Sequence, residues 1–182
     1  MPRNVAFLRA INVGGHVVKM DALRAHFVAL GFADAETFIA SGNVIFSSRA
    51  GAKAAARKIE ARLLAALGYE VRTFVRTGAE VAAASRLRPW PEARITSAGA
   101  FCIGFLDAPL TAAQRTVVHS FATDDDAFHV NGADVYWLCR SRQSDSAFDY
   151  AKFERHLKTR ASFRGMNTIT RLVSKYGLGG AA

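Results

Sequence analysis

The chain has 182 residues, of which 51% are hydrophobic, and its formal net charge is +9. This length suits one compact domain or two small ones, and the apolar fraction excludes a long disordered chain. No apolar run approaches the length of a membrane span, and the N-terminal segment, which carries Arg9, lacks the apolar core of a signal peptide.

The first half of the chain predicts a β-α-β-β-α-β order of elements. Alternating apolar residues predict strands at 5–11, 37–40, 44–46 and 70–76, and apolar residues three or four apart predict helices at 21–30 and 52–67. Gly31 and Gly68 follow the two helices, as is typical of helix ends. This order predicts a ferredoxin-like α+β unit at residues 1–76.

The second half predicts a degenerate copy of the first, an α+β unit of similar topology at residues 77–182. Pro89 ends its first helix, Thr111 is expected to cap a later one, and Asn131-Gly132 is a strong hairpin signal. The expected elements are a helix at 77–87, a strand at 98–106, a helix at 111–121, hairpin strands at 128–130 and 135–139, helices at 150–158 and 168–176, and a frayed tail at 177–182.

The positive charge is concentrated towards the C-terminus. Residues 138–175 hold nine of the 24 basic residues and three of the 15 acidic ones, so six of the nine excess charges lie there. A positive excess favours anionic partners such as nucleic acid, a nucleotide or an acidic surface. The alternative is a biased composition, since Arg outnumbers Lys about three to one, but bias alone does not explain the clustering.

The two cysteines indicate a compartment. Cys102 and Cys139 are isolated in apolar, strand-like segments, so we expect free, buried thiols in a reducing environment. This predicts a cytoplasmic protein, with a functional thiol pair as the alternative.

Three segments carry motifs that resemble those of a known family. They are Phe7-Leu8-Arg9-Ala10-Ile11-Asn12-Val13-Gly14-Gly15, Lys19-Met20 and Ser41-Gly42-Asn43-Val44-Ile45-Phe46. The pattern resembles the family called domain of unknown function 1697, whose members show L-R-G-I-N-V-G-G, then K-M before the first helix, and S-G-N-V at the start of a strand. The resemblance extends to residues 161–168, where the family carries T-x-R-N-W-x-T. It implies two α+β units of ferredoxin-like character and no established activity.

The chain departs from the family pattern at two places. Ala10 stands where the family usually has Gly. Gly165-Met166 stands where it usually has Asn-Trp, so a ligand contact by those two side chains would have no counterpart here.

A candidate ligand site follows from the topology of the first unit. In a ferredoxin-like fold, the loop after strand one and the turn between strands two and three lie at one edge of the sheet, so we expect Asn12 and Asn43 within about one side-chain length of each other. Free amides of Gly14 and Gly15 beside a helix N-terminus can bind an anion. The alternative is structural, because glycines also simply permit turns.

The same reasoning applies to the second unit, where residues 107–111 and Asn131-Gly132 are expected to meet at an edge. A further alternative site is the open sheet face of the first unit, where aromatic and basic residues could stack RNA bases. Packing of the second unit over that face, which would bury the rings, is the favoured expectation. The residues concerned are Phe7, Arg9, Arg72, Phe74 and Arg76.

Catalytic motifs are sparse. His16 could act as a general base, but a single loop histidine is usually solvated. Consecutive aspartates at 124–126, followed by His129, are more typical of a solvated turn than of a metal site, so no metal is expected. The sequence contains no nucleophile elbow and no zinc-ligand spacing.

These observations predict a binding module for a phosphate-bearing ligand, either nucleic acid or a nucleotide. The alternatives are a small-molecule enzyme with its site at the same edge, or a basic protein-interaction module. We expect any nucleic acid to bind weakly, without sequence preference, through Arg155, Arg160, Arg164 and Arg171. No cofactor, catalytic residue or oligomeric state is indicated. The candidate ligand-binding residues are Arg9, Asn12, Gly14, Gly15, Ser41, Gly42, Asn43, Arg164, Asn167 and Thr168.

Overall fold

The structure, a computed structural model, describes residues 1–179 as two compact units. The first unit comprises Met1–Ala83 with the C-terminal segment from Leu172, and the second comprises Ala84–Arg171. The division into domains at residues 1–76 and 77–182 stays a prediction. Across the described residues, no helix combines the length and apolar character needed to cross a membrane.

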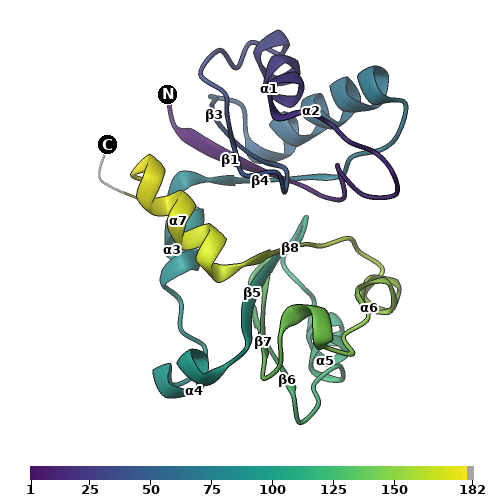
Figure 1. Cartoon of the computed structure of the whole chain (residues 1–182), viewed down its shortest axis with the longest axis vertical. Coiled ribbons are helices and arrows are strands. Elements are labelled where there is room, and N and C mark those ends of the chain that lie inside the picture. The colour runs from purple at the N-terminus through teal and green to yellow at the C-terminus, as the bar shows by residue number, and fades with distance from the viewer. Residues whose placement is uncertain (180–182) are drawn as a thin grey trace. The chain divides into compact units, whose positions relative to one another are not determined.

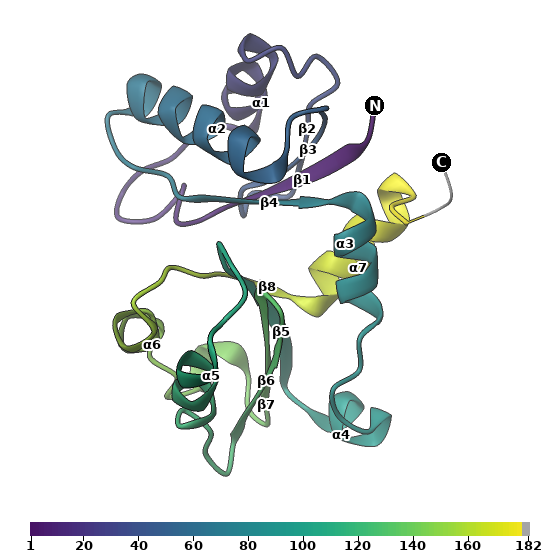
Figure 2. The same cartoon turned by 180° about the vertical axis from the view of Figure 1, so that it is seen from behind.

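The first unit is the α+β fold that the sequence predicts, an antiparallel sheet covered on one face by two helices (Figures 1 and 2). The strand order is β2-β3-β1-β4. Its elements are β1 (Arg3–Leu8), α1 (Met20–Ala29), β2 (Glu36–Phe38), β3 (Asn43–Ser47), α2 (Ala52–Leu67) and β4 (Thr73–Thr77).

The core of the first unit lies between the sheet and its two helices. Leu23 and Phe27 are four residues apart on α1, and Ile59 and Leu63 are four apart on α2, so each helix presents one apolar stripe to the sheet. The sheet contributes alternate strand residues to the same cluster, namely Ala6, Leu8, Val44, Phe46 and Val75.

The opposite face of this sheet is also buried. Phe7 pairs with Phe74 across β1 and β4, and the two are 0% and 2% exposed. Base stacking on these rings, the alternative raised by the sequence, is therefore wrong, because neither ring presents a face to solvent.

The second unit repeats this topology, with strand order β6-β7-β5-β8. Its elements are α4 (Glu92–Ser97), β5 (Ala100–Phe105), α5 (Ala112–His119), β6 (Asp126–Asn131), β7 (Asp134–Cys139), the 3-10 turn η1 (Gln143–Asp145), α6 (Tyr150–Leu157) and β8 (Ser162–Gly165). The short segments α4, η1 and β8 are absent from the sequence prediction. β8 completes the β-α-β-β-α-β order, which makes the second unit a fuller copy than predicted.

Two helices begin in one unit and end in the other: α3 (Gly78–Arg86), directly after β4, and α7 (Met166–Tyr176), directly after β8. In the first unit, Arg3 donates from Nη1 to the backbone oxygen of Tyr176 at 2.9 Å, and the Tyr176 ring contacts Phe38. In the second unit, the Tyr136 hydroxyl donates to the backbone oxygen of Ala84 at 3.1 Å. Each unit is thus completed by a helix end that follows the other unit's last strand. The frayed tail predicted at 177–182 lies partly outside the described residues.

Candidate functional site

The candidate site is the edge of the first unit formed by loop residues 9–19 and turn residues 39–42, which we call the glycine edge. Leu8 N donates to Gly42 O at 2.8 Å, and the Asn12 side chain donates to Ala40 O at 3.1 Å. Loop and turn therefore meet, as the topology predicted.

Glycine geometry shapes the tip of the loop. Gly14 and Gly15 have φ values of +70° and +86°, both are exposed, and a Cβ at either position would meet no atom within 4 Å. Within residues 1–179, neither amide donates to a protein acceptor. Two consecutive backbone N–H groups are therefore available to a ligand.

The same loop is braced on both sides of its tip. Asn12 accepts from Val18 N at 2.7 Å through Oδ1, in addition to its bond to the turn. The Tyr69 hydroxyl donates to Ile11 O at 2.9 Å, and the His16 ring stacks on Tyr69 with centroids 3.9 Å apart. The contacts give Asn12 and His16 positioning roles, and they hold the glycines in place before any ligand arrives.

Gly42 and Asn43 fix the turn through close packing and hydrogen bonds. A Cβ on Gly42, whose φ is +76°, would lie 2.9 Å from Ile11 Cγ2, so only glycine fits between loop and turn. Asn43 is fully buried and donates from Nδ2 to Phe38 O at 3.1 Å and to Ser41 Oγ at 2.8 Å. The Asn43 side chain is therefore part of the frame, whereas Ser41 remains exposed.

Two residues that are not glycine adopt left-handed backbone at this edge. Ala10 has φ +56° and Ile39 has φ +52°, which explains why β1 ends at Leu8 and β2 at Phe38, before the predicted strand ends at residues 11 and 40. A β-branched residue in this region is strained, and such strain gathers at functional sites. The sequence contained one signal of it, because the family glycine falls at Ala10.

The electrostatics of the glycine edge favour an anion. Lys19 is the N-cap residue of α1 and makes no side-chain capping bond. The first-turn amides, which form the positive end of the helix dipole, therefore have no side-chain acceptor from the N-cap. Arg9 is half-buried in the loop, and its backbone N–H donates to Arg72 O at 2.8 Å. Asp21 in the first helical turn offsets part of this charge.

The remaining candidates lie elsewhere in the chain. Arg164 is on β8 of the second unit and donates from Nη1 to Ser162 Oγ and Phe163 O, both at 2.9 Å. Burial lowers the pKa of the Arg164 guanidinium to about 10. Asn167 is exposed and Thr168 half-buried near the start of α7. Participation of these three residues in a site with the glycine edge stays a prediction.

The corresponding edge of the second unit also closes as predicted. Leu106 N donates to Ala133 O at 2.9 Å and Leu110 N to Gly132 O at 3.2 Å, which joins the loop before α5 to the β6–β7 turn. Here Thr111 and Gln114 form a capping box, in which each side chain accepts from the backbone amide of the other residue.

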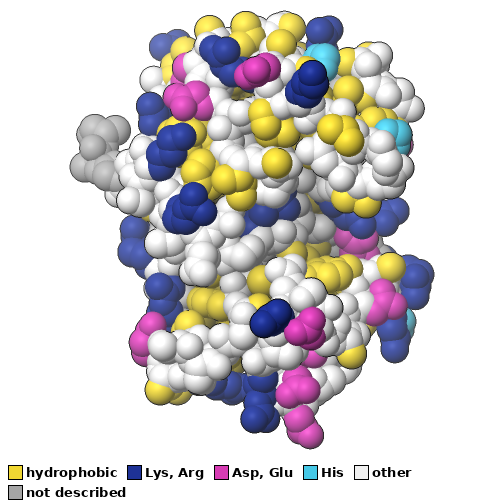
Figure 3. Space-filling view, in the orientation of Figure 1, with side chains coloured by type: hydrophobic (Ala, Val, Ile, Leu, Met, Phe, Trp, Pro, Cys, Tyr) yellow, Lys and Arg dark blue, Asp and Glu magenta, His cyan; other side chains and the backbone are white. Residues whose placement is uncertain are grey.

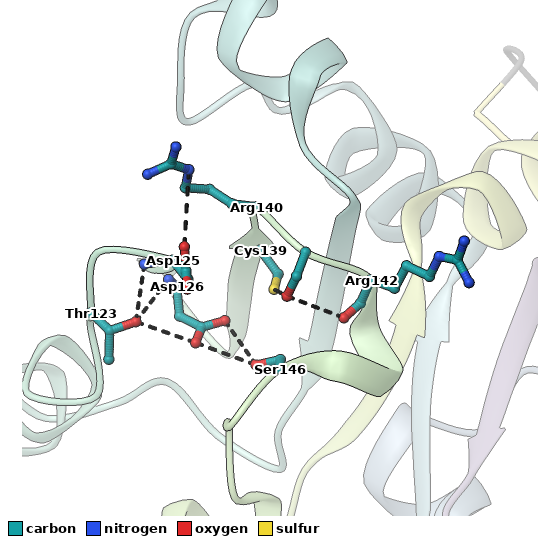
Figure 4. Close-up of polar contacts among 8 residues, drawn as sticks. Thr123, Asp125, Asp126, Cys139, Arg140, Arg142 and Ser146 are labelled. Atoms are coloured by element: carbon teal, nitrogen blue, oxygen red, sulfur yellow. Dashed lines mark hydrogen bonds and ion pairs between the residues drawn. The ribbon is translucent and has the colours of Figure 1, made fainter.

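One of the three aspartates at 124–126, Asp126, is a structural anchor that the sequence reasoning missed, whereas Asp124 and Asp125 are exposed. Asp126 is only 5% exposed and accepts from Trp137 Nε1 at 2.7 Å. It also accepts from Ser146 Oγ at 3.0 Å (Figure 4). Asp125 lies 4.0 Å from Arg140 Nε. Across the described part of the chain, no three His, Cys, Asp or Glu side chains gather as metal ligands. The alternation along β6, which places Asp126 on the side of buried Phe128, could have revealed the burial.

Both cysteines are free and buried, as predicted. Burial, and to a lesser extent Cys139, raises the pKa of the Cys102 thiol to about 12, and its Sγ contacts Gln143 Oε1 at 3.6 Å. The Cys102 thiol therefore stays protonated near neutral pH and is a poor nucleophile.

Clefts occur in both units, away from the glycine tip. A cleft of about 310 Å³ lies between α2 and the segment before β4, with Arg57, Glu60 and Leu64 on its helical wall. Another, of about 510 Å³, is lined in the second unit by residues that include Arg94, Asp124 and Arg140. Both have walls of mixed charge, so neither selects an anion as clearly as the glycine edge.

Comparisons with known proteins agree with the fold. A family described as "Protein of unknown function (DUF1697)" matches residues 1–136, which leaves the C-terminal motif at 161–168 outside the match. The solved structure of the conserved bacterial protein SP0830 from Streptococcus pneumoniae is similar to this chain, with a TM-score of 0.71 and 21% identity over 97% of this chain and 99% of that one. At this identity the likeness concerns the fold alone. No curated protein sequence matched.

Proposed function

The chain belongs to the DUF1697 family, and from that premise we propose that it is a binding module for a phosphate-bearing ligand held at the glycine edge. A phosphate group needs several hydrogen-bond donors that converge from one side, together with local positive potential. The glycine edge offers both.

The observation that carries the proposal is the pair of exposed amides at Gly14 and Gly15. Both glycines hold a positive φ with open space beside them, and their N–H groups have no acceptor within residues 1–179. Amides at a braced loop tip need little reorganisation to bind an anion, so the ordering cost of binding is small.

The first turn of α1 adds to this potential. Lys19 is the N-cap residue but its side chain does not accept from these amides, and its ammonium group adds a positive charge next to the loop. An anion at this place would interact favourably with the helix dipole, by about 0.3–1 kcal/mol at an exposed position.

A nucleotide is the ligand class that we favour for this edge. His16 stacks on Tyr69 next to Gly15, so a partly apolar ring system lies beside the proposed phosphate position. Aromatic side chains stack on nucleobases, whereas inorganic phosphate would gain nothing from them. A cytoplasmic location belongs to the same proposal and is supported by the two free, buried cysteines.

Calorimetric titration with AMP, GMP and inorganic phosphate tests the proposal, with wild-type protein and the variants Gly14→Ala and Gly15→Ala. A methyl group at these positions meets no neighbour but strains the backbone, so it redirects the amides without blocking the surface. We expect nucleotide affinity to fall at least about tenfold, because a hydrogen bond to a charged group contributes about 1.5–3 kcal/mol.

Gly31→Ala is the matched control. Gly31 follows α1 with φ +87° and equally open surroundings, so the substitution imposes the same backbone strain outside the loop. It should lower stability as much as the loop variants do and leave affinity unchanged. Nucleotide binding that survives in both loop variants would show that the glycine amides are not the ligand donors.

A further inference from the structure

The second unit carries a surface of basic residues on α5, α6 and the segment after α6. Five exposed cations lie there: Arg115, Lys152, Arg155, Lys158 and Arg160. The two helices pack together, because Gln114 Nε2 donates to Leu157 O at 2.9 Å and the Phe121 and Phe153 rings lie 5.3 Å apart. We call these five residues the α5–α6 basic surface, and we propose that it binds the phosphate backbone of double-stranded nucleic acid.

The cations of α6 lie on one side of the helix and at its C-terminal end. Lys152 and Arg155 are three residues apart and therefore share one side, and Lys158 ends the helix with φ +53°. On α5, Gln114 bonds the C-terminal end of α6, and the next residue, Arg115, is exposed and donates from Nε to Leu110 O at 3.3 Å. Positive charges are thus spread along α6 and onto its neighbour.

The acidic residues of α6 are used within the fold. Glu154 is 6% exposed and accepts from Ala161 N at 3.0 Å and from Arg160 Nη1 at 3.2 Å. Asp149 is the N-cap and accepts from Lys152 N at 2.9 Å. The hydrogen bond from the Lys152 backbone amide lowers the pKa of the Asp149 carboxyl, and burial opposes part of this effect. With two carboxylates against five cations, the surface stays net positive.

The chemistry of this surface selects among anionic partners. The large exposed hydrophobic residues of the described chain all lie in the first unit: Met1, Val13, Val17, Val28, Ile39 and Leu64. A membrane-bound helix inserts apolar side chains, and a protein interface needs a buried apolar or aromatic anchor. Cations without such an anchor match a chain of phosphates, which is bound by charge alone.

The structure also revises which arginines are expected to make these contacts. The sequence pointed to Arg155, Arg160, Arg164 and Arg171, but Arg164 is half-buried and donates to Ser162 and Phe163. Arg171 lies on α7. Lys152, Lys158 and Arg115 take their place, since they share exposed positions on neighbouring helices. On the face shown in Figure 3, Lys and Arg side chains are dispersed among Asp and Glu side chains.

Fluorescence anisotropy of a labelled 20-base-pair DNA duplex, titrated at 50–200 mM NaCl, tests the proposal. Each phosphate contact contributes a slope of about −0.9 to the logarithmic dependence of affinity on salt. The triple variant Lys152→Gln, Arg155→Gln, Lys158→Asn keeps polar side chains, and Asn tolerates the left-handed backbone at residue 158. If each residue makes one phosphate contact, the slope should flatten by about 2.7. Between 50 and 200 mM NaCl the affinity of the variant should then fall by a factor about 40 smaller than that of the wild type.

Neutralising Lys53, Lys58 and Arg62 to Gln is the matched control. These residues are exposed on α2 of the first unit, so the control changes net charge equally but not the proposed surface. An equal flattening in the control, or an unchanged slope in the α6 variant, would overturn the proposal. So would binding of phosphatidylserine vesicles or polyglutamate without binding of the duplex.

The inference does not rest on the proposed function. Gly14→Ala should leave duplex binding unchanged, and the α6 variant should leave nucleotide binding unchanged. Failure of either proposal is therefore visible by itself.

Discussion

In both units a backbone hydrogen bond joins the loop after the first strand to a β-turn, but the helix that follows the loop has a side-chain cap only in the second unit. Leu8 N bonds Gly42 O in the first unit, and Leu106 N bonds Ala133 O in the second. The second-unit loop is short and ends in the capping box of Thr111 and Gln114, which satisfies the backbone amides of these two residues. The first-unit loop is longer, runs through two consecutive left-handed glycines and reaches α1 without a side-chain cap.

This contrast suggests that the two edges serve different purposes. A side-chain cap uses one of the free amides at a helix start, whereas a start without a side-chain cap keeps all of them for an anion. Because the topology is shared, the difference lies in the loop sequences. In the second unit the amide of Gln114 is bonded within the fold, whereas in the first unit α1 has no side-chain cap.

The largest expected effect concerns the packing of loop against turn. Gly42→Ala should destabilise the protein by about 3 kcal/mol, because it adds left-handed strain to a 2.9 Å clash with Ile11. Gly132→Ala, in the corresponding turn of the second unit, meets open space and should cost only about 1 kcal/mol. Urea unfolding monitored by circular dichroism compares the two. Equal losses would mean that the two edges are packed alike.

A smaller effect is expected from exchanging the caps. Thr111→Ala removes the acceptor for Gln114 N and should cost about 1 kcal/mol. Lys19→Asp supplies a side-chain cap for α1 and should stabilise the protein by up to about 1 kcal/mol. It should also weaken nucleotide binding, because it replaces a positive charge next to the loop with a negative one and occupies a first-turn amide of α1. Unfolding and calorimetric titration measure the two quantities. A stabilised Lys19→Asp variant that binds the nucleotide as well as the wild type does would show that the first turn of α1 does not contribute to binding.

The smallest effect concerns Ala10. Its φ of +56° costs an alanine about 1 kcal/mol or more relative to glycine, part of which the added freedom of unfolded glycine offsets. We therefore expect Ala10→Gly to stabilise the protein by about 0.5–1 kcal/mol, detectable as a raised midpoint of urea unfolding. Ala40→Gly, at an exposed turn position without positive φ, should give no such gain. A loss of stability in Ala10→Gly would show that the methyl group makes a contact that outweighs the strain.

Local signals in the sequence were sufficient for much of the fold. Helix α2 begins and ends where the apolar spacing and Gly68 predict, and Thr111 caps α5. The meeting of loop and turn at each edge followed from the order of elements alone. Such features depend on residues close in sequence, or on topology, so no knowledge of packing is needed to predict them.

Other features were decided only by the tertiary structure. β8 is four residues long and forms because it pairs with β5, about 60 residues earlier in the chain. Asp126 looked like one of three solvated aspartates until Trp137 and Ser146 enclosed it. Asn12 and Asn43 looked like ligand-binding side chains, yet both bond the backbone of their own edge. The residue types at a site can be read from the sequence, but whether a polar group faces a ligand or its own fold depends on neighbours that are distant along the chain.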